Sequence, residues 1–351
     1  MASTAPATQQ AAVLENPGPD AHISLRQDVP VDTPGPGEVL VKLSHTGICG
    51  SEVRALHGWG SYNRIIGHEG VGTVISHGKD VDASILGKRV GVKWLSGSCN
   101  ECASCKSGFR HNCPRQVNTG RSCPGTLQQY VVADPRYVTE IPAGVAAEVA
   151  APLLCAGLTM MGAVAAVKDG MTKGDWVVIL GSGGGLGHIG VQIASRMRDF
   201  RVIGVDAGED KRELTLESGA EAFIDYREED VAAKVVSLTG EGAHAVLVVP
   251  GTKDAFAIAP SLARNRATIA CVGLPADDLD IPISVMTCVR KALTIKGVMV
   301  GSEEDMVELL HQADKGVITP RVKVVGLDRA GETVSKLADA GVVGRVVVAL
   351  P

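Results

Sequence analysis

Four cysteines lie close together in one short segment of the 351-residue chain, at Cys99, Cys102, Cys105 and Cys113. The first three are separated by two residues each, and this spacing lets a tight turn aim neighbouring sulfur atoms at one point. Four thiolates gathered in this way form a tetrahedral zinc site, with Zn–S distances of about 2.3 Å. The pattern predicts a structural zinc lobe over residues 95–115.

The same spacing is also found in disulfide-bonded segments and in redox-active CxxC motifs. The first ten residues have neither the charged start nor the long apolar stretch of a secretion signal, so nothing points to an oxidising compartment. The segment is poor in apolar residues, and a metal would have to hold it together. A structural zinc supplies an apparent ~10–16 kcal/mol. The zinc interpretation is therefore favoured, with reduced thiols and a cytoplasmic location.

A glycine-rich turn, Gly181-Ser-Gly-Gly-Gly-Leu-Gly187, follows the apolar stretch 175–180 and precedes a predicted helix. A backbone without side chains lets a pyrophosphate reach a helix N-terminus, where amide N–H groups favour an anion. The next predicted strand ends at Asp206, at about the distance expected for the acid that binds a ribose 2′-hydroxyl. The pattern predicts dinucleotide binding. The alternative is a glycine loop that serves only helix–sheet packing.

Asp206 also predicts which dinucleotide binds. A 2′-phosphate at about 4 Å from its carboxylate would cost on the order of 1–4 kcal/mol. That cost corresponds to up to about a thousandfold in affinity. We therefore expect NAD(H) rather than NADP(H).

Cys49, His68, Glu69 and Cys155 form a second set of candidate metal ligands. Taken one at a time, each cysteine is more often a buried apolar residue, and the histidine is more often a hydrogen-bonded core residue. The set gains weight because the same chain carries a cysteine-rich lobe and a nucleotide-binding pattern.

Around these residues the sequence resembles the zinc-dependent alcohol dehydrogenases of the medium-chain dehydrogenase/reductase family, and in particular their tetrameric microbial branch. The resemblance extends over nearly the whole chain from about residue 35. The stretches that carry it are Gly67–Gly70 with Gly72, Gly78 and Val81, then 92–99, 128–130, 154–157, 184–187, 324–327 and 343–345.

The resemblance implies that Cys49, His68 and Cys155 hold a catalytic zinc with one position left open, so that the protein carries two zinc ions per chain. Glu69 is expected to approach or briefly bind this metal, or to hydrogen-bond one of its ligands. Ser51 is expected to accept the proton of the substrate. The implied reaction interconverts an alcohol and its aldehyde or ketone by hydride transfer with NAD(H).

The resemblance also implies the cofactor and substrate contacts. The expected cofactor-binding residues are Gly181, Gly184, Gly185, Leu186, Gly187, Asp206, Lys211, Val272, Val300 and Arg345, with Thr159 as a further contact. Lys211 is expected near the adenosine ribose and Arg345 on the pyrophosphate. Trp94, Trp59 and Leu274 are expected to line the substrate pocket.

The chain departs from the family pattern after Cys49. Gly50 stands where the family usually has Arg or His, Glu52 replaces an aspartate, and Arg54 replaces the histidine that releases the proton. Arginine cannot be deprotonated near neutral pH, so the proton must leave by another route, for which His45 and His57 are candidates. The second hypothesis is a pocket remodelled for an alcohol or aldehyde bulkier than ethanol.

Composition excludes some functions. The net charge of −5 argues against a nucleic-acid partner, and no apolar run approaches the ~18 residues of a membrane span. The expected partner is a small alcohol or carbonyl compound. By resemblance the chain forms a homo-tetramer or dimer.

The elements that must position these residues follow from patterning. Residues 1 to about 12 are expected to be a loose tail, and the chain to about residue 140 is mostly β. Residues 145–167 predict two helices broken or kinked at Pro152. Strands and helices then alternate, which specifies a doubly wound parallel sheet. We expect a GroES-like catalytic domain over 1–156, a Rossmann domain over 157–299, and a return to the catalytic domain over 300–351.

Two rival functions remain open at this stage. One is an enzyme that uses the same zinc and cofactor scaffold for a non-redox step, which the altered proton relay favours. The other is a non-catalytic zinc- and nucleotide-binding protein, which the complete ligand set and Ser51 argue against.

Overall fold

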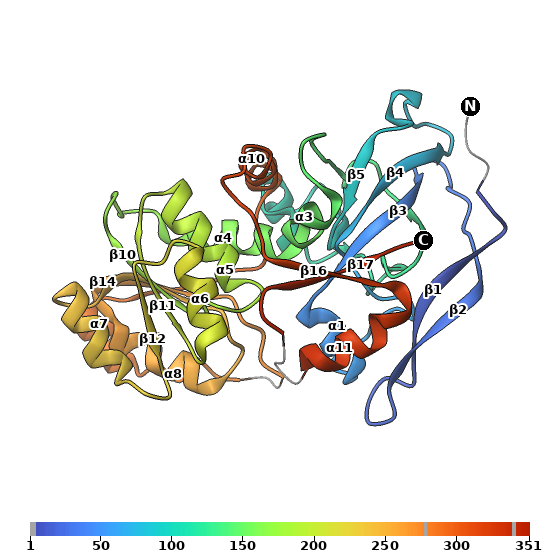
Figure 1. Cartoon of the computed structure of the whole chain (residues 1–351). Helices are drawn as coiled ribbons and strands as arrows, with labels where there is room; N and C mark the ends of the chain where they lie inside the picture. Colours follow the sequence, from blue (N-terminus) through green and yellow to red (C-terminus); the bar gives the residue numbers. More distant parts are fainter. Residues whose placement is uncertain (1–4, 277–278, 339–341) are drawn as a thin grey trace. The chain divides into compact units, whose positions relative to one another are not determined.

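The computed structural model describes residues 5–276, 279–338 and 342–351 (Figure 1). The chain divides into two compact units. Unit 1 comprises Met1–Cys155, Ser302–Gly316 and Pro320–Pro351, and unit 2 comprises Ala156–Gly301 and Val317–Thr319.

Unit 1 is built on a seven-stranded sheet with the order β16-β17-β3-β4-β5-β9, in which β8 also pairs with β3. Its strands are β3 (Val39–Ile48), β4 (Gly70–His77), β5 (Arg89–Val92), β8 (Tyr130–Ala133), β9 (Thr139–Glu140), β16 (Val322–Gly326) and β17 (Arg345–Ala349). Alternate residues of β3 face one core, where Val39, Val41 and Leu43 pack with side chains of β4, β5 and β8.

Two small sheets and several helices complete unit 1. The sheets pair β1 (Thr8–Glu15) with β2 (His22–Pro30), and β6 (Leu95–Gly97) with β7 (Val117–Asn118). The helices are α1 (Gly50–Leu56), α2 (Ala103–Lys106), α3 (Ala147–Pro152), α10 (Glu303–Asp314) and α11 (Ala330–Ala338), with 3-10 turns η1 (Ala83–Ile85), η2 (Arg110–Asn112) and η5 (Leu327–Arg329).

Unit 2 is a six-stranded parallel sheet with the order β12-β11-β10-β13-β14-β15. The strands are β10 (Trp176–Leu180), β11 (Arg201–Asp206), β12 (Ala222–Asp225), β13 (Ala243–Val248), β14 (Ala263–Cys271) and β15 (Thr294–Gly297). Every residue of β10 is buried, as expected for a strand covered on both faces.

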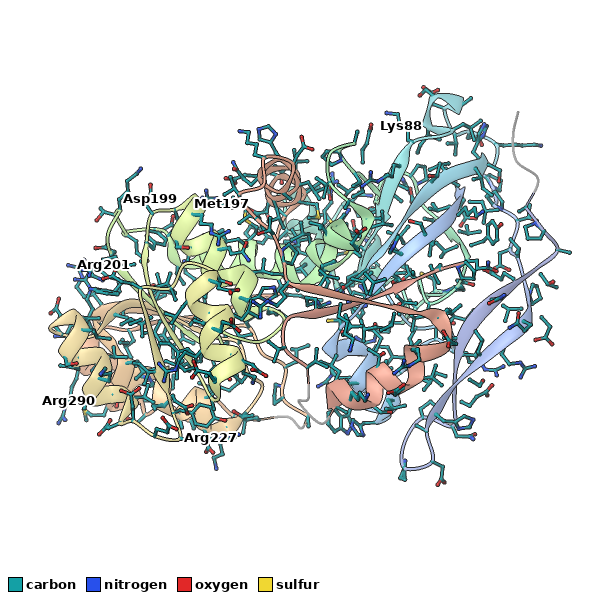
Figure 2. All side chains as sticks on the ribbon, in the orientation of Figure 1. Lys88, Met197, Asp199, Arg201, Arg227 and Arg290 are labelled. Atoms are coloured by element: carbon teal, nitrogen blue, oxygen red, sulfur yellow. The ribbon has the colours of Figure 1, made fainter. Side chains whose placement is uncertain are left out.

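Helices alternate with these strands. They are α4 (Leu158–Val167), α5 (Gly187–Gln192), α6 (Glu209–Glu217), α7 (Val231–Thr239), α8 (Lys253–Leu262) and α9 (Val285–Lys291), with a π-helical turn η4 (Ile193–Met197) after α5. Side chains of α7 and α8 pack on one face of the sheet. Arg201, Arg227 and Arg290 lie exposed on this unit (Figure 2), and the Arg201 guanidinium lies 3.8 Å from the centre of the Trp176 ring. The predicted combination of a GroES-like domain and a Rossmann sheet is confirmed by these two units.

The prediction of a loose N-terminal tail is wrong for residues 8–12. They belong to β1, which pairs antiparallel with β2. The apolar stretch 11–14 explains the difference, because Ala12 and Leu14 are buried in a core of unit 1, and the Leu14 N–H donates to the Arg64 carbonyl at 2.7 Å.

The predicted break at Pro152 is also different in the structure. Helix α3 ends at Pro152, and a π-helical turn η3 (Leu153–Gly157) carries the chain directly into α4. The wider turn accommodates the proline, which lacks an N–H donor. Among the described residues, the continuous run Ala147–Val167 is long and apolar enough to cross a membrane. However, 72% of its most apolar window is buried inside the protein, as in the core helix of a globular fold.

The buried position of β1 predicts different costs for two leucines in one hairpin. Leu14 is 2% exposed and Leu25 is 38% exposed. Leu14→Ala is expected to lower the free energy of unfolding by about 2–5 kcal/mol, because it leaves a cavity. Leu25→Ala is expected to change it by less than about 0.5 kcal/mol. Urea unfolding followed by fluorescence measures both. Equal, negligible costs would mean that the N-terminal segment does not pack.

Candidate active site

The second set of ligand candidates converges within unit 1. Cys49 is the N-cap of α1, His68 and Glu69 precede β4, and Cys155 lies in the π-helical turn η3. One ligand atom from each of these four residues lies within 4.8 Å of the others. The Cys49 and Cys155 sulfur atoms are 3.8 Å apart, and His68 Nε2 lies 3.2 Å from the Cys155 sulfur.

The donor set fits a zinc ion. Two thiolates at about 2.3 Å from a tetrahedral zinc lie about 3.8 Å from each other, whereas a disulfide brings them to about 2.05 Å. The observed separation of 3.8 Å matches the first geometry, and both cysteines are free. Two sulfur atoms and one imidazole nitrogen leave a fourth position for another ligand.

Local backbone requirements bring His68 to this point. Gly67 has a φ of +100°, and a Cβ there would lie 2.8 Å from the Thr126 hydroxyl oxygen, so only glycine fits. Gly47 is equally constrained, because a Cβ there would lie 1.8 Å from a Glu69 carboxylate oxygen. The glycines therefore let the backbone approach closely on both sides of the site.

Glu52 orients two of the candidate ligands. Its Oε1 lies 2.9 Å from His68 Nδ1, and its Oε2 accepts a hydrogen bond from the Cys49 backbone N–H at 2.7 Å. A carboxylate on Nδ1 fixes the ring so that Nε2 is free to bind a metal. Glu52 is itself 2% exposed.

Glu69 pairs with Arg345 rather than pointing freely at the cluster. Arg345 Nη2 donates to both Glu69 carboxylate oxygens, at 2.5 and 2.6 Å, and neither residue is more than 4% exposed. Within the described part of the chain, the buried Nε of Arg345 has no hydrogen-bond partner. The guanidinium therefore retains a donor that an anion could satisfy.

Burial and neighbouring charges shift the pKa values in this cluster. The hydrogen bond with Cys155, and then His68 and Arg345, hold the pKa of Cys49 well below its usual value despite burial. The same hydrogen bond and burial raise the pKa of Cys155. Burial raises the pKa of Glu69 to about 7, against the opposing effect of Arg345.

The predicted pocket residues lie in different surroundings. The Trp94 ring meets the His68 ring edge-on, with 5.2 Å between the ring centres. The backbone N–H of Thr119 donates to the Trp94 carbonyl at 2.9 Å and so fixes the segment that carries Trp94. Trp59 is 38% exposed and stacks on His57 at 4.6 Å. Leu274 belongs to unit 2 and is 72% exposed.

The residues after Cys49 form the first turns of α1. Ser51 is partly buried there. Gly50 is exposed, and a Cβ at this position would meet no atom within 4 Å. The Arg54 guanidinium lies 5.8 Å from the centre of the Trp59 ring. His45 lies on β3, with Nδ1 at 3.1 Å from the Ser44 hydroxyl.

The four cysteines of the lobe also converge in unit 1. The sulfur of Cys99 lies 3.9 Å from that of Cys105 and 3.5 Å from that of Cys113, and Cys102 and Cys113 are 3.9 Å apart. Backbone N–H groups of Glu101 and Cys102 lower the pKa of Cys99 to about 6. These separations fit a tetrahedral metal and exclude disulfides within the lobe.

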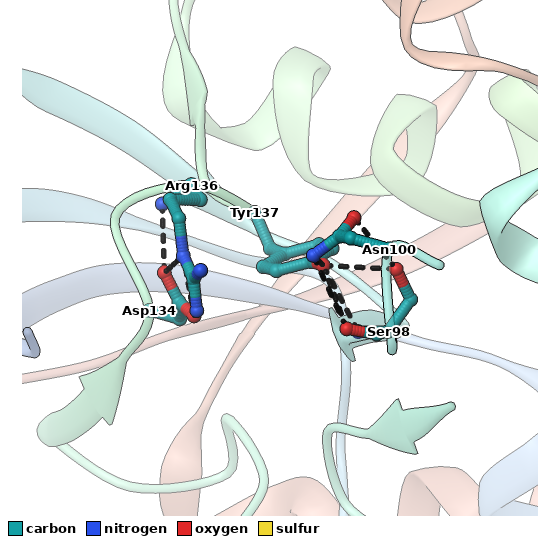
Figure 3. A network of polar contacts seen from close by, with 5 residues as sticks. All are labelled: Ser98, Asn100, Asp134, Arg136 and Tyr137. Atoms are coloured by element: carbon teal, nitrogen blue, oxygen red, sulfur yellow. Dashed lines mark hydrogen bonds and ion pairs between the residues drawn. The ribbon is translucent and has the colours of Figure 1, made fainter. Parts of the chain in front are cut away.

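Tyr137 attaches this lobe to the sheet (Figure 3). Its hydroxyl oxygen accepts hydrogen bonds from the Ser98 N–H at 3.0 Å and from the Asn100 side-chain amide at 2.9 Å. Its carbonyl accepts from the buried Lys93 Nζ at 2.7 Å. The lobe is therefore anchored next to the residue that precedes Trp94.

The glycine turn lies in unit 2 between β10 and α5. Gly181 has a φ of +74°, and a Cβ on Gly187 would lie 2.0 Å from the Gly181 carbonyl oxygen. Asp206 ends β11 and is 5% exposed. Its Oδ2 accepts from the Gly183 N–H at 3.0 Å, so the turn and the acid are directly joined.

The other predicted cofactor residues divide between the units. Lys211 Nζ donates to Asp206 Oδ1 at 2.9 Å. Val272 follows β14 and is buried, and Thr159 is buried in α4. The carbonyl of Val300 lies against α4 at Gly162, whereas Arg345 belongs to unit 1. Gly184, Gly185 and Leu186 lie in the same turn as Gly181.

Sequence reasoning missed two features of these sites. The pairing of Glu69 with Arg345 joins residues 276 positions apart, and no local pattern signals it. Gly183 was not among the predicted cofactor residues, although a Cβ there would lie 2.4 Å from the Lys211 Cβ. The run of three glycines was the available signal.

Comparisons with known proteins agree with this description. The alcohol dehydrogenase GroES-like domain family matches residues 35–143, and the zinc-binding dehydrogenase family matches residues 185–315. Alcohol dehydrogenase 2 of Emericella nidulans is 37% identical over 365 residues, which covers 98% of each chain.

Solved structures show the same fold. Acetophenone reductase from Geotrichum candidum, in complex with NAD, is 25% identical with a TM-score of 0.85, over 99% of this chain and 98% of that chain. A zinc-binding dehydrogenase of Sinorhizobium meliloti, bound to NADP, is 26% identical with a TM-score of 0.88, over 99% and 100% of the two chains. The chain therefore belongs to the zinc-dependent alcohol dehydrogenases of the medium-chain dehydrogenase/reductase family.

Proposed function

We propose that this enzyme interconverts an alcohol bulkier than ethanol and its aldehyde or ketone, with NAD(H) as the cofactor. The observation that carries the proposal is the convergence of Cys49, His68 and Cys155, whose ligand atoms fit zinc and leave one position open. We assign these three residues as the catalytic zinc ligands and the four lobe cysteines as the structural zinc ligands.

The bound groups supply the central chemistry: zinc is a Lewis acid that lowers the pKa of an alcohol, and NAD accepts its hydride. The residues of the chain support that chemistry. Glu52 orients His68 through Nδ1. Glu69, paired with Arg345, adds a carboxylate beside the ligands without leaving an unpaired buried charge. The unpartnered Nε of Arg345 supports a contact with the pyrophosphate.

NAD(H) is favoured over NADP(H) by Asp206. Its carboxylate is held by Gly183, Ala207 and Lys211 in the position expected to bind a ribose 2′-hydroxyl. A carboxylate fixed in this way repels a 2′-phosphate. The related structures include complexes with either cofactor, so this residue and not the fold makes the distinction.

The preference for a bulky substrate is supported by two observations. Trp59, one of the two expected pocket tryptophans, is 38% exposed and stacks on His57, whereas Trp94 lies against His68. The structurally similar enzyme from Geotrichum candidum is an acetophenone reductase, and acetophenone is an aromatic ketone.

A panel of alcohols and carbonyl compounds, followed by the absorbance of the reduced cofactor, tests this function. We expect kcat/KM to be higher for benzyl or cinnamyl alcohol than for ethanol, and higher with NAD than with NADP by about tenfold or more. A preference for ethanol would overturn the bulky pocket. Product formation without any cofactor turnover would instead indicate a non-redox enzyme.

The proton is expected to leave the substrate through Ser51. Loss of a proton-transferring group typically lowers a rate by about 10²–10⁴-fold. Ser51→Ala is therefore expected to lower kcat/KM by about 10²-fold with zinc content unchanged, whereas Ser84→Ala, in the exposed turn η1, serves as the matched control. Wild-type activity in Ser51→Ala would exclude this route.

The group that passes the substrate proton from Ser51 to solvent is assigned to His57 or His45, since Arg54 cannot release a proton near neutral pH. The pH profile of kcat should change in His57→Gln or in His45→Ala. An unchanged profile in both variants would mean that neither is the exit.

We also infer a homo-dimer or tetramer formed through α9 and β15. The residues of this face are unusually apolar for a surface: Val285, Met286 and Val289 are 58–78% exposed, and β15 is the edge strand of the sheet. Large exposed apolar patches and open sheet edges mark association sites.

The nine free cysteines support a reducing, cytoplasmic location.

Val289→Asp is expected to shift the protein toward the monomer, because it buries a charge in the interface. Val307→Asp changes an equally apolar residue on α10, where Val307 is 60% exposed, and should leave the mass unchanged. Light scattering coupled to gel filtration measures the mass. A Val289→Asp protein with the mass of the wild type would show that this face is not the interface.

A further inference from the structure

Asp225 is a buried carboxylate that the proposed chemistry does not use. It ends β12 and is the register partner of Asp206, which ends β11. Neighbouring strands lie about 4.8 Å apart, so the two residues stand side by side at one end of the parallel sheet. Asp225 is 6% exposed, and a buried carboxylate needs a reason to be there.

Its hydrogen bonds supply that reason. Asp225 Oδ2 accepts from the Gly208 N–H at 2.8 Å, and Oδ1 accepts from the Arg227 N–H at 2.9 Å. Asp206 Oδ1 accepts from the Ala207 N–H at 2.9 Å. The two carboxylates therefore bind successive N–H groups of the turn that joins β11 to α6.

This turn sets the position of Lys211, which pairs with Asp206. Gly208 is the residue before α6 and has a φ of +91°, so the backbone reverses there in a conformation that favours glycine. The Tyr226 N–H, one residue after Asp225, donates to the Asp206 carbonyl at 3.2 Å. The Asp206 carbonyl and the Gly208 N–H therefore both hydrogen-bond to residues at the end of β12.

Asp225 also adds a charge at this edge. The backbone N–H groups of Gly208 and Arg227 hold the pKa of Asp225 below its usual value. Arg227 and Arg212 lie close enough to contribute in the same direction. The carboxylate is therefore ionised at neutral pH, next to the acid that faces the ribose.

We propose that Asp225 is a positioning residue for the cofactor: it holds the 207–208 turn so that Asp206 accepts the 2′-hydroxyl of NAD(H) and rejects a 2′-phosphate. This inference rests on the NAD(H) preference proposed above. It makes cofactor selection depend on two adjacent strands rather than on Asp206 alone.

The test compares Asp225→Ala and Asp225→Asn in the full-length, zinc-loaded protein. Kd values for NADH and NADPH are measured by titration of nicotinamide fluorescence. Asp225→Ala loses both hydrogen bonds and is expected to weaken NADH binding about tenfold and to reduce the NADH/NADPH affinity ratio by a similar factor. Asp225→Asn keeps one acceptor and should fall between Asp225→Ala and the wild type.

Asp230→Asn is the matched control. It changes a nearby exposed carboxylate that caps α7, by accepting from the Ala233 N–H, and does not touch the 207–208 turn. Its affinity ratio should equal that of the wild type. A general loss of stability would weaken both cofactors alike, so the ratio separates positioning from a merely structural role.

The outcomes distinguish the two proposals. Folded Asp225 variants with the wild-type affinity ratio would overturn the role of Asp225 and leave the NAD(H) preference standing. A wild-type protein that binds NADPH as tightly as NADH would overturn both. If Asp225→Ala does not fold, Asp225→Asn alone decides, because a reduced ratio supports the role and an unchanged ratio refutes it.

Discussion

The burial of ionisable groups around Cys49 is the constraint on which unit 1 depends. Two thiols, an imidazole, two carboxylates and a guanidinium are all nearly removed from solvent there. Burying such groups is costly unless each is paired or binds a metal. Glu52 pairs with the His68 ring and the Cys49 backbone, and Arg345 pairs with Glu69. The two sulfur atoms and the imidazole Nε2 are the atoms that these pairs leave available to a metal. A divalent cation is a partner that fits these donor atoms.

The surrounding fold can be understood as support for that cluster. The π-helical turn after Pro152 carries Cys155, a glycine without room for a Cβ precedes His68, and Cys49 caps the N-terminus of α1. These three proposed ligands come from separate elements of unit 1, so none of them can be positioned by local sequence alone. In unit 2 the same principle applies to the ends of parallel strands, where Asp206 and Asp225 organise one turn.

The sequence predicted much of this and failed where distant partners decide the outcome. Periodicity and glycine placement were enough for the parallel sheet, and cysteine spacing was enough for the lobe. The N-terminal strand was missed because its burial depends on Leu127 and other residues far along the chain. The pairing of Glu69 with Arg345 was missed for a similar reason. The two side chains form a buried ion pair only after the fold has brought β17 next to β3.

Anomalous diffraction at the zinc absorption edge, on crystals of the zinc-replete protein, tests the central claim most directly. The account predicts one peak bonded to the sulfur atoms of Cys49 and Cys155 and to Nε2 of His68, and a second peak bonded to the four lobe cysteines. A peak at the lobe alone, with the Cys49 cluster empty or its residues apart, would contradict it.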